Sequence, residues 1–279
     1  MRVRLPAFLL AVGLLLTGCS ADEAPTADGT LRERAAVLVD VVRDAVEEAK
    51  AQRTEESGSV QDRAPADDAR LRTDTQTAFD YEEYSGTVRD VFGLLDQYWS
   101  EVLPAEFGVE YTAPADYLYY RPEEGPGPTC GEEEAPKRNA FYCPVEDFIA
   151  WDETGLLIPY YVSAGDFAAA FVLAHEFGHA MQARLPEQEE LGVLRELQAD
   201  CFAGAWAAYL SQQGHLDPGD LDEATLAVFT ARDLPGTAFT DPRAHGSGFE
   251  RTRAFADGFE AGPKRCYPAP AQDWVVAAR

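Results

Sequence analysis

Basic residues are scarce in this 279-residue chain, which has 23 lysines and arginines against 49 aspartates and glutamates. The formal net charge of −26 at pH 7 makes nucleic acids and anionic lipid surfaces poor partners, because they carry charge of the same sign. Histidine is scarcer still, with four residues in the chain. A site with two histidines would therefore contain half of the histidines in the chain.

The chain also lacks an apolar run long enough to span a bilayer. The N-terminal run, from Leu5 to Leu16, is shorter than the roughly 20 residues that a membrane-spanning helix needs. With arginines before it, the run predicts a secretory signal peptide over residues 1–18. The sequence LTGC, which ends at Cys19, resembles the bacterial lipobox, so we expect Cys19 to carry a lipid that anchors an extracytoplasmic protein to the cell membrane. The alternative is a soluble secreted protein in which Cys19 has no special role.

Four cysteines remain after Cys19, and an even number in an exported chain favours two disulfides. Three pairings are possible. Cys130 and Cys143 flank a stretch rich in glycine, proline and charge, and closing a loop of that size stabilises by roughly 3 kcal/mol in the chain-entropy model. Cys201 then pairs with Cys266 by elimination. The alternative for Cys201 is a buried free thiol on an apolar helix.

The N-terminal half of the chain predicts two helices joined by a connection. Residues 30–56 have apolar positions at helical spacing with charges between them, so we expect one amphipathic helix. Residues 57–75 are polar and predict a flexible connection, and a second helix is expected over about 76–103, ending at Pro104. The predicted organisation is a signal peptide (1–18), a tether (19–29), an N-terminal helix with its connection (30–75) and one domain (76–279).

The C-terminal domain is expected to be α+β and predominantly helical, with a small sheet preceding two antiparallel helices. Strands are predicted within 109–121 and over 147–152. Good helix formers with start and stop signals predict the first central helix from about 163 to 185 and the second from about 190 to 213, closed by Gly214. Two further helices are expected, near 220–232 and 246–261.

The sequence AHEFGHA holds two histidines, His175 and His179, four positions apart on the first central helix. Both imidazoles leave the same face about one turn apart, so they can bind one metal ion. Glu176 lies beside them, placed to act as a base on a metal-bound water. The alternative is that the spacing arose by chance, because the pattern is short.

The second central helix supplies carboxylates at the same one-turn spacing, at Glu196 and Asp200. A zinc ion needs a third protein ligand, which Glu196 can provide, and Asp200 can accept the other N–H of a ligating histidine. Their alternative role is a solvated polar face. The rest of this helix is apolar almost all round, and a buried acid without a partner costs several kcal/mol, which favours metal ligation. The three-histidine pattern is excluded, because Gln182 and Leu185 stand where glycine and histidine would be needed.

The sequences AHEFGHAMQ, ELQADCFAGAW and HGSGFERTRAFADGFEAG together resemble the family of putative neutral zinc metallopeptidases of bacterial exported and membrane-anchored proteins. The resemblance covers roughly the last two hundred residues. The pattern of the expected ligands is also similar to the broader glutamate-zincin pattern. It implies a zincin-like fold, one Zn²⁺, and a peptide or protein substrate. The residues it implies are His175, His179 and Glu196 as zinc ligands, Glu176 as general base, and Asp200 as a partner of a ligating histidine.

A second histidine motif, HGSGFER, begins at His245, which is our candidate donor to the oxyanion of the reaction. Tyr160 and Tyr161 are reserves for that role, and a histidine that only caps the last helix is the alternative. Arg251 is expected to be a structural ion-pair partner, and His215 a surface or capping residue.

The function expected from the sequence is a membrane-anchored, extracytoplasmic zinc peptidase, in which Glu176 takes a proton from a zinc-activated water. An extended substrate is expected to lie along a sheet edge near 147–152. The alternative is a zinc-stabilised envelope lipoprotein without activity that serves as a scaffold or binding module. Glu176 separates the two, because a structural zinc site is closed by a fourth ligand and has no use for a base.

Overall fold

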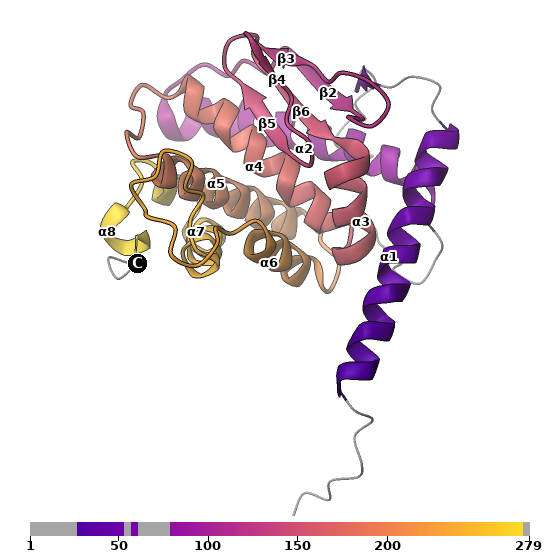
Figure 1. The fold of residues 1–279 in the computed structure, drawn as a ribbon. Helices are drawn as coiled ribbons and strands as arrows, with labels where there is room; N and C mark the ends of the chain where they lie inside the picture. The colour runs from indigo at the N-terminus through magenta and orange to yellow at the C-terminus, as the bar shows by residue number, and fades with distance from the viewer. Residues whose placement is uncertain (1–26, 53–56, 61–78, 276–279) are drawn as a thin grey trace, which may run out of the picture. The chain divides into compact units, whose positions relative to one another are not determined.

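The computed structural model describes residues 27–52, 57–60 and 79–275, and the contacts divide the chain into two compact units, Met1–Val37 and Leu38–Arg279. The predicted signal peptide and Cys19 lie outside the described residues, and the predicted domain boundaries stay predictions. The larger unit is α+β and predominantly helical, as predicted (Figure 1). Its central and C-terminal helices are α2 (Tyr81–Phe107), α3 (Ile158–Ala164), α4 (Asp166–Arg184), α5 (Gly192–Gln213), α6 (Asp220–Thr230), α7 (Gly248–Ala261) and α8 (Ala271–Trp274). No helix in the described part of the chain is both long and apolar enough to cross a membrane.

The predicted N-terminal helix is α1 (Ala27–Gln52), and its last two turns belong to the larger unit, where Ala45 and Ala49 are buried. Arg121 is buried, its Nε donates to Glu153 Oε2 at 2.8 Å, and its Nη2 donates to the carbonyl of Ala49 at 2.9 Å. The backbone N–H of Tyr81 donates to the Glu48 carboxylate at 3.3 Å. A carbonyl at the end of α1 is thus satisfied by a buried guanidinium.

The small sheet precedes the central helices, as predicted, and its strand order is β1-β2-β6-β5. The parallel pair β2–β6 lies at its centre and the outer strands pair antiparallel. The predicted strand at 147–152 is β6, but the expectation that it forms an edge was wrong, because β5 pairs along its other side. Strand β1 forms at the start of the segment 57–75, where a flexible connection was expected, because it pairs with β2, and strand β5 was not predicted. The strands are β1 (Ser57–Ser59), β2 (Asp116–Tyr120), β5 (Ala140–Cys143) and β6 (Phe148–Asp152), with a separate hairpin of β3 (Thr129–Cys130) and β4 (Glu133–Glu134).

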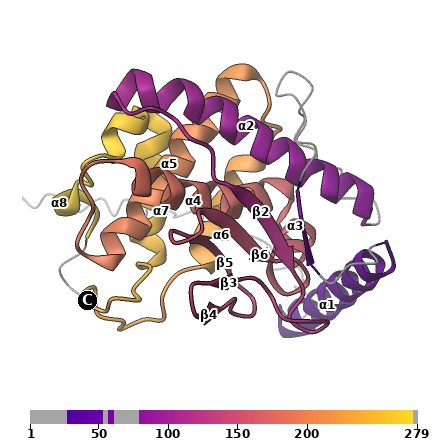
Figure 2. The same cartoon turned by 90° about the horizontal axis from the view of Figure 1, so that it is seen from above.

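Figure 1 shows α4 between the sheet and the helices α5 and α7, and Figure 2 shows α2 running along one side of this arrangement. The predicted central helices are α4 and α5, and Gly214 closes α5 in the left-handed conformation, as expected. Both are buried along most of their length, and they are joined by a short segment. Two elements before α4 were not predicted: α3 and the π-helical turn η2 (Glu153–Leu157).

The expected end of the second helix at Pro104 was wrong. Proline lacks the N–H that would donate to the carbonyl of Ser100 and crowds that carbonyl, but Ser100 is exposed and Pro104 stands in the last turn of the helix. The helix continues to Phe107 and ends at Gly108, whose N–H donates to the carbonyl of Pro104 at 3.1 Å. Proline in the last turn therefore does not end this helix.

Helices α5 and α7 cross at glycines. A Cβ added to Gly204 would lie 2.0 Å from the carbonyl oxygen of Phe255, and one added to Gly258 would lie 1.9 Å from that of Cys201. No heavy-atom pair tolerates such a separation, so only glycine permits this backbone approach. The crossing lies between the middle of α5 and the second half of α7, and Arg251, one turn before Phe255, reaches Asp200, one turn before Gly204.

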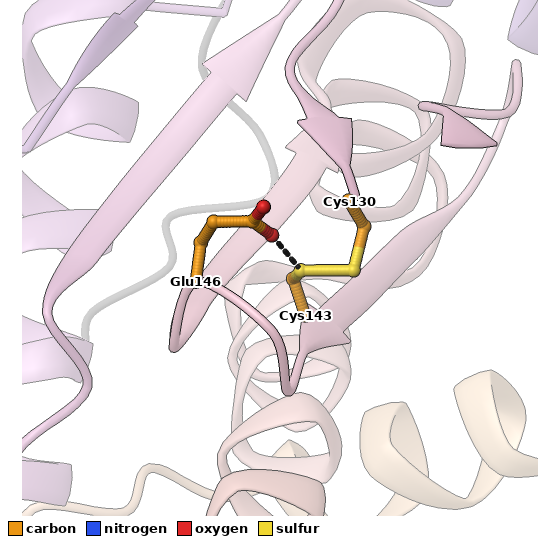
Figure 3. A group of neighbouring side chains, drawn as sticks. All are labelled: Cys130, Cys143 and Glu146. Carbon is orange, nitrogen blue, oxygen red and sulfur yellow. Dashed lines mark hydrogen bonds between the residues drawn. A yellow bond between two sulfur atoms is a disulfide. The ribbon is translucent and has the colours of Figure 1, made fainter. Parts of the chain in front are cut away.

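The structure contains the two predicted disulfides, Cys130–Cys143 and Cys201–Cys266. The first joins the β3–β4 hairpin to the end of β5, and Figure 3 shows the Glu146 carboxylate directed at Cys143, with an oxygen 2.9 Å from Sγ. Both Glu146 oxygens also accept the N–H of Gly131 at 3.2 Å. These three side chains could form a metal-binding group, but with the sulfurs joined neither offers a thiolate. The second disulfide ties α5 to the 3₁₀ turn η3 (Pro263–Cys266).

Reduction of the denatured protein is expected to raise its intact mass by two hydrogens for each disulfide. Removing Cys201–Cys266 should lower the free energy of unfolding more than removing Cys130–Cys143, about 4 against about 3 kcal/mol, because it closes the longer loop (separations of 65 and 13 residues). Paired serine variants unfolded in denaturant measure the difference. An unchanged mass on reduction would contradict both disulfides.

Candidate metal centre

The two histidines of α4 and Glu196 of α5 meet in the structure. The Nε2 atoms of His175 and His179 are 3.2 Å apart. Glu196 Oε2 lies 3.2 Å from His175 Nε2, and its Oε1 lies 3.5 Å from His179 Nε2. One turn of helix separates the histidines, and the packing of α5 on α4 delivers the carboxylate. The structure therefore places together all three residues that the sequence predicted as ligands.

The other nitrogen of each imidazole has its own acceptor. His175 Nδ1 lies 2.8 Å from Asp200 Oδ1, and His179 Nδ1 lies 2.9 Å from Gln182 Oε1. The amide of Gln182 is oriented by its Nε2, which donates to the carbonyl of Arg195 at 2.6 Å. Each Nδ1 therefore donates its proton to its own acceptor, which leaves Nε2 of each ring as the atom that would bind a metal ion once it is deprotonated.

This donor set suits a metal ion. Two imidazole lone pairs and a carboxylate converge, and acceptors so arranged need a cation between them. Ligands bound tetrahedrally at 2.0–2.1 Å would be about 3.3 Å apart, close to the three separations here. Nitrogen and carboxylate ligands in this number are typical of a zinc site that keeps one position open.

Arg251 and Asp200 form a buried ion pair behind His175. Arg251 Nε donates to Asp200 Oδ2 at 2.8 Å and its Nη2 donates to Oδ1 at 2.7 Å. Its Nη1 donates to the carbonyl of Ala231 at 2.8 Å. Arg251 therefore forms the structural ion pair that was expected. Through Arg251, helix α7 holds the Asp200 carboxylate, and this carboxylate in turn orients His175.

The charges of the cluster depend on one another. Burial alone would lower the pKa of His175, but the carboxylates of Asp200 and Glu196 raise it to about 10. Burial alone would raise the pKa of Glu196, but His179 and His175 hold it well below its usual range. Burial would likewise raise the pKa of Asp200, and Arg251 lowers it. The carboxylates stay ionised and favour a cation at the imidazoles.

Glu176, the predicted base, is 7% exposed and lines a cavity of about 760 Å³ with the three predicted ligands. In the part of the chain that the structure describes, its carboxylate has no hydrogen-bond partner. The carboxylate is thus available to a molecule that enters the cavity.

Of the candidate oxyanion donors, His245 and Tyr160 line the cavity, and Tyr161 does not. His245 lines the cavity with a side chain that is 53% exposed, and its Nδ1 lies 3.5 Å from Asp233 Oδ1. Tyr160 lines the cavity as well. The reserve role for Tyr161 was wrong, because its ring packs edge-on against Tyr84, away from the cavity, with centroids 5.3 Å apart. His215 is partly buried just after α5, where its N–H donates to the carbonyl of Leu210 at 3.0 Å.

Sequence reasoning missed Gln182, which it used only to exclude a third histidine. Its side chain is buried and contacts both His179 and the backbone of α5. A signal was present, since Gln182 lies three residues after His179 and hence on the same helix face. A long polar residue there can reach the imidazole.

Comparison with known proteins gives consistent matches. A family model described as "Putative neutral zinc metallopeptidase" matches residues 49–267. The Escherichia coli K12 protein YpfJ is 34% identical over 155 residues, 45% of this chain and 52% of the relative. The Mycobacterium tuberculosis H37Rv protein Rv2575 is 31% identical over 210 residues, 64% of this chain and 68% of the relative. The chain spans about half the length of the E. coli relative. No solved structure matches.

Proposed function

Because the chain belongs to the family of putative neutral zinc metallopeptidases, we propose that it hydrolyses peptide bonds with one zinc ion held by His175, His179 and Glu196. The observation that supports this best is the meeting of three metal-binding side chains and Glu176 in one cavity. A purely structural site would be closed by a fourth protein ligand. Here the described residues offer three ligands and a cavity.

In the proposed mechanism, the residues around the metal bind the substrate and move protons. When bound, zinc supplies a Lewis acid that makes water a nucleophile near neutral pH. Glu176 would accept a proton from water as the water attacks the peptide carbonyl, and would pass that proton to the departing amine. His245 and Tyr160 are the proposed donors to the oxyanion, from the rim and the wall of the cavity.

The substrate is proposed to lie along β5. This edge strand contributes Ala140, Phe141 and Tyr142 to the cavity lining, and one of its sides is unpaired in the described sheet. An extended peptide added there would present its backbone carbonyl to the cavity. The edge strand proposed to bind the substrate is thus β5, and not β6 as the sequence predicted.

The cellular place of the activity is also a proposal. The N-terminal apolar run and the LTGC sequence support export and a lipid anchor on Cys19, and disulfides persist in oxidising compartments. We propose an extracytoplasmic peptidase held at the cell membrane.

Metal analysis of the purified protein is expected to find about one zinc ion per chain, because the described residues form one open three-ligand site of this kind. Incubation with a mixed peptide library, read by mass spectrometry, should show cleavage that a chelator abolishes and that added zinc restores. Zinc retained without cleavage would favour the scaffold role instead. A protein that binds no zinc would contradict the ligand set.

A further inference from the structure

The cavity of the metal centre is basic in a strongly acidic protein. Its lining includes two carboxylates, Glu176 and Glu196, and both have a role in the proposed chemistry. Four arginines line the same cavity: Arg138, Arg195, Arg232 and Arg251. The whole chain has more than twice as many acids as bases, so the excess of basic residues in this lining is opposite in sign to the net charge of the protein.

Three of these arginines have no acidic partner among the described residues. Arg138, Arg195 and Arg232 are exposed, and no ion pair joins any of them to a described carboxylate. Several arginines outside the cavity are paired with acids, for example Arg184 with Asp147 at 3.0 Å and Arg265 with Asp257 at 2.9 Å. Arg89 and Arg253 also lack an acidic partner among the described side chains, and neither lines the cavity.

The three unpaired arginines reach the cavity from three different elements. Arg195 directly precedes the ligand Glu196 on α5. Arg138 precedes β5 and has a positive φ of 54°, held by its N–H, which donates to Asp152 Oδ2 at 2.8 Å. Arg232 follows α6, where its guanidinium lies 4.1 Å from the ring centroid of Phe229 and donates to the carbonyl of that residue. Local contacts therefore hold the guanidinium of Arg232 and the backbone of Arg138.

A neighbouring hollow of about 390 Å³ extends the basic lining. It shares Arg195, Glu196 and His245 with the main cavity and adds Lys137 and Arg243. Glu196 is the one acid that lines it. Lys137 pairs with Glu123 at 3.0 Å and Arg243 with Asp241 at 3.8 Å, so Arg195 is the basic residue of this hollow that lacks an acidic partner among the described residues.

We propose that the substrate is an acidic peptide, with aspartate or glutamate side chains close to the scissile bond that pair with Arg138, Arg195 and Arg232. The proposal rests on the proposed peptidase function. Guanidinium groups bind carboxylates through charge-assisted, often bidentate, hydrogen bonds. The overall negative charge does not oppose this at close range, because salt screens exposed charges beyond about 10 Å at 0.1 M.

Cleavage is tested with matched peptides whose acidic residues are replaced by glutamine and asparagine, or by lysine. Each is made with a free and with an amidated C-terminus, which separates recognition of side-chain carboxylates from recognition of the terminal one. We expect kcat/KM to be highest for the acidic peptides with either terminus, and the preference to shrink as salt is raised. A preference that needs the free terminus would overturn the side-chain assignment.

The variants are the triple change Arg138→Gln, Arg195→Gln and Arg232→Gln, and the matched control Arg253→Gln, an exposed arginine outside the cavity. The triple variant should lower the acidic-to-neutral ratio of kcat/KM by roughly ten- to a hundredfold, a few-fold for each pair lost. The control should keep the wild-type ratio. Circular dichroism and zinc content show whether the triple variant is folded.

Binding of fluorescent peptides to the Glu176→Gln protein separates the two proposals. Cleavage without any preference for acidic peptides would overturn the substrate class and leave the peptidase function standing. Arginine-dependent binding of acidic peptides, with no cleavage by the wild type, would overturn the peptidase function and leave the preference for acidic peptides standing. Equal binding of acidic and neutral peptides would overturn the substrate class in either case.

Discussion

Replacing Glu176 with glutamine is expected to lower kcat for peptide hydrolysis by about 10²–10⁴-fold, the usual contribution of a general base. Glutamine keeps the size of the side chain but cannot accept the proton of the attacking water. Glu176 lines the cavity beside the predicted ligands and is not one of them, so the variant should retain its zinc. Initial rates on a cleaved peptide, with zinc content measured on the same sample, give the result.

The matched control is Glu190→Gln, the same chemical change at an exposed position outside the cavity. It should leave kcat and zinc content as in the wild type. If Glu176→Gln kept wild-type kcat, another group would have to be the base. If it lost its zinc, the carboxylate would be a ligand.

Replacing Asp200 with alanine should lower the free energy of unfolding by about 3–5 kcal/mol, because it leaves the Arg251 charge buried and unpaired. Zinc affinity should fall by about 10–100-fold as well, because His175 loses the acceptor that orients it. Denaturant unfolding of the chelated protein with its disulfides intact gives the stability. Competition with a chromophoric chelator gives the affinity.

The double variant Asp200→Ala with Arg251→Met separates these effects. Removing the uncompensated charge should recover part of the lost stability, whereas zinc affinity should stay low because His175 still has no acceptor. A loss below about 1 kcal/mol in Asp200→Ala would show that the ion pair is not the support described here.

The site was predictable because it depends on spacing within helices. His175 and His179, and again Glu196 and Asp200, are four residues apart, so a helical period alone places each pair on one face. The apolar surroundings of Glu196 and Asp200 then exclude a solvated role. Helices α4 and α5 were identified by the same periodicity with clear start and stop signals.

The elements that were missed depend on contacts between distant segments. Strand β5 follows residues rich in glycine, proline and charge and becomes a strand by pairing with β6. Tyr160 and Tyr161 are adjacent in sequence, and only the packing of α3 decides which faces the cavity. The three unpaired arginines of the cavity come from separate parts of the chain, so no local pattern joins them.

The glycine crossing of α5 and α7 limits how this protein can change over evolutionary time. Gly204 and Gly258 contact neither the predicted ligands nor the cavity, yet any side chain at either would force the two backbones apart. Arg251 on α7 would then withdraw from Asp200 on α5, and His175 would lose its support. These positions should therefore accept as few alternatives as the ligands themselves, although they have no chemistry of their own.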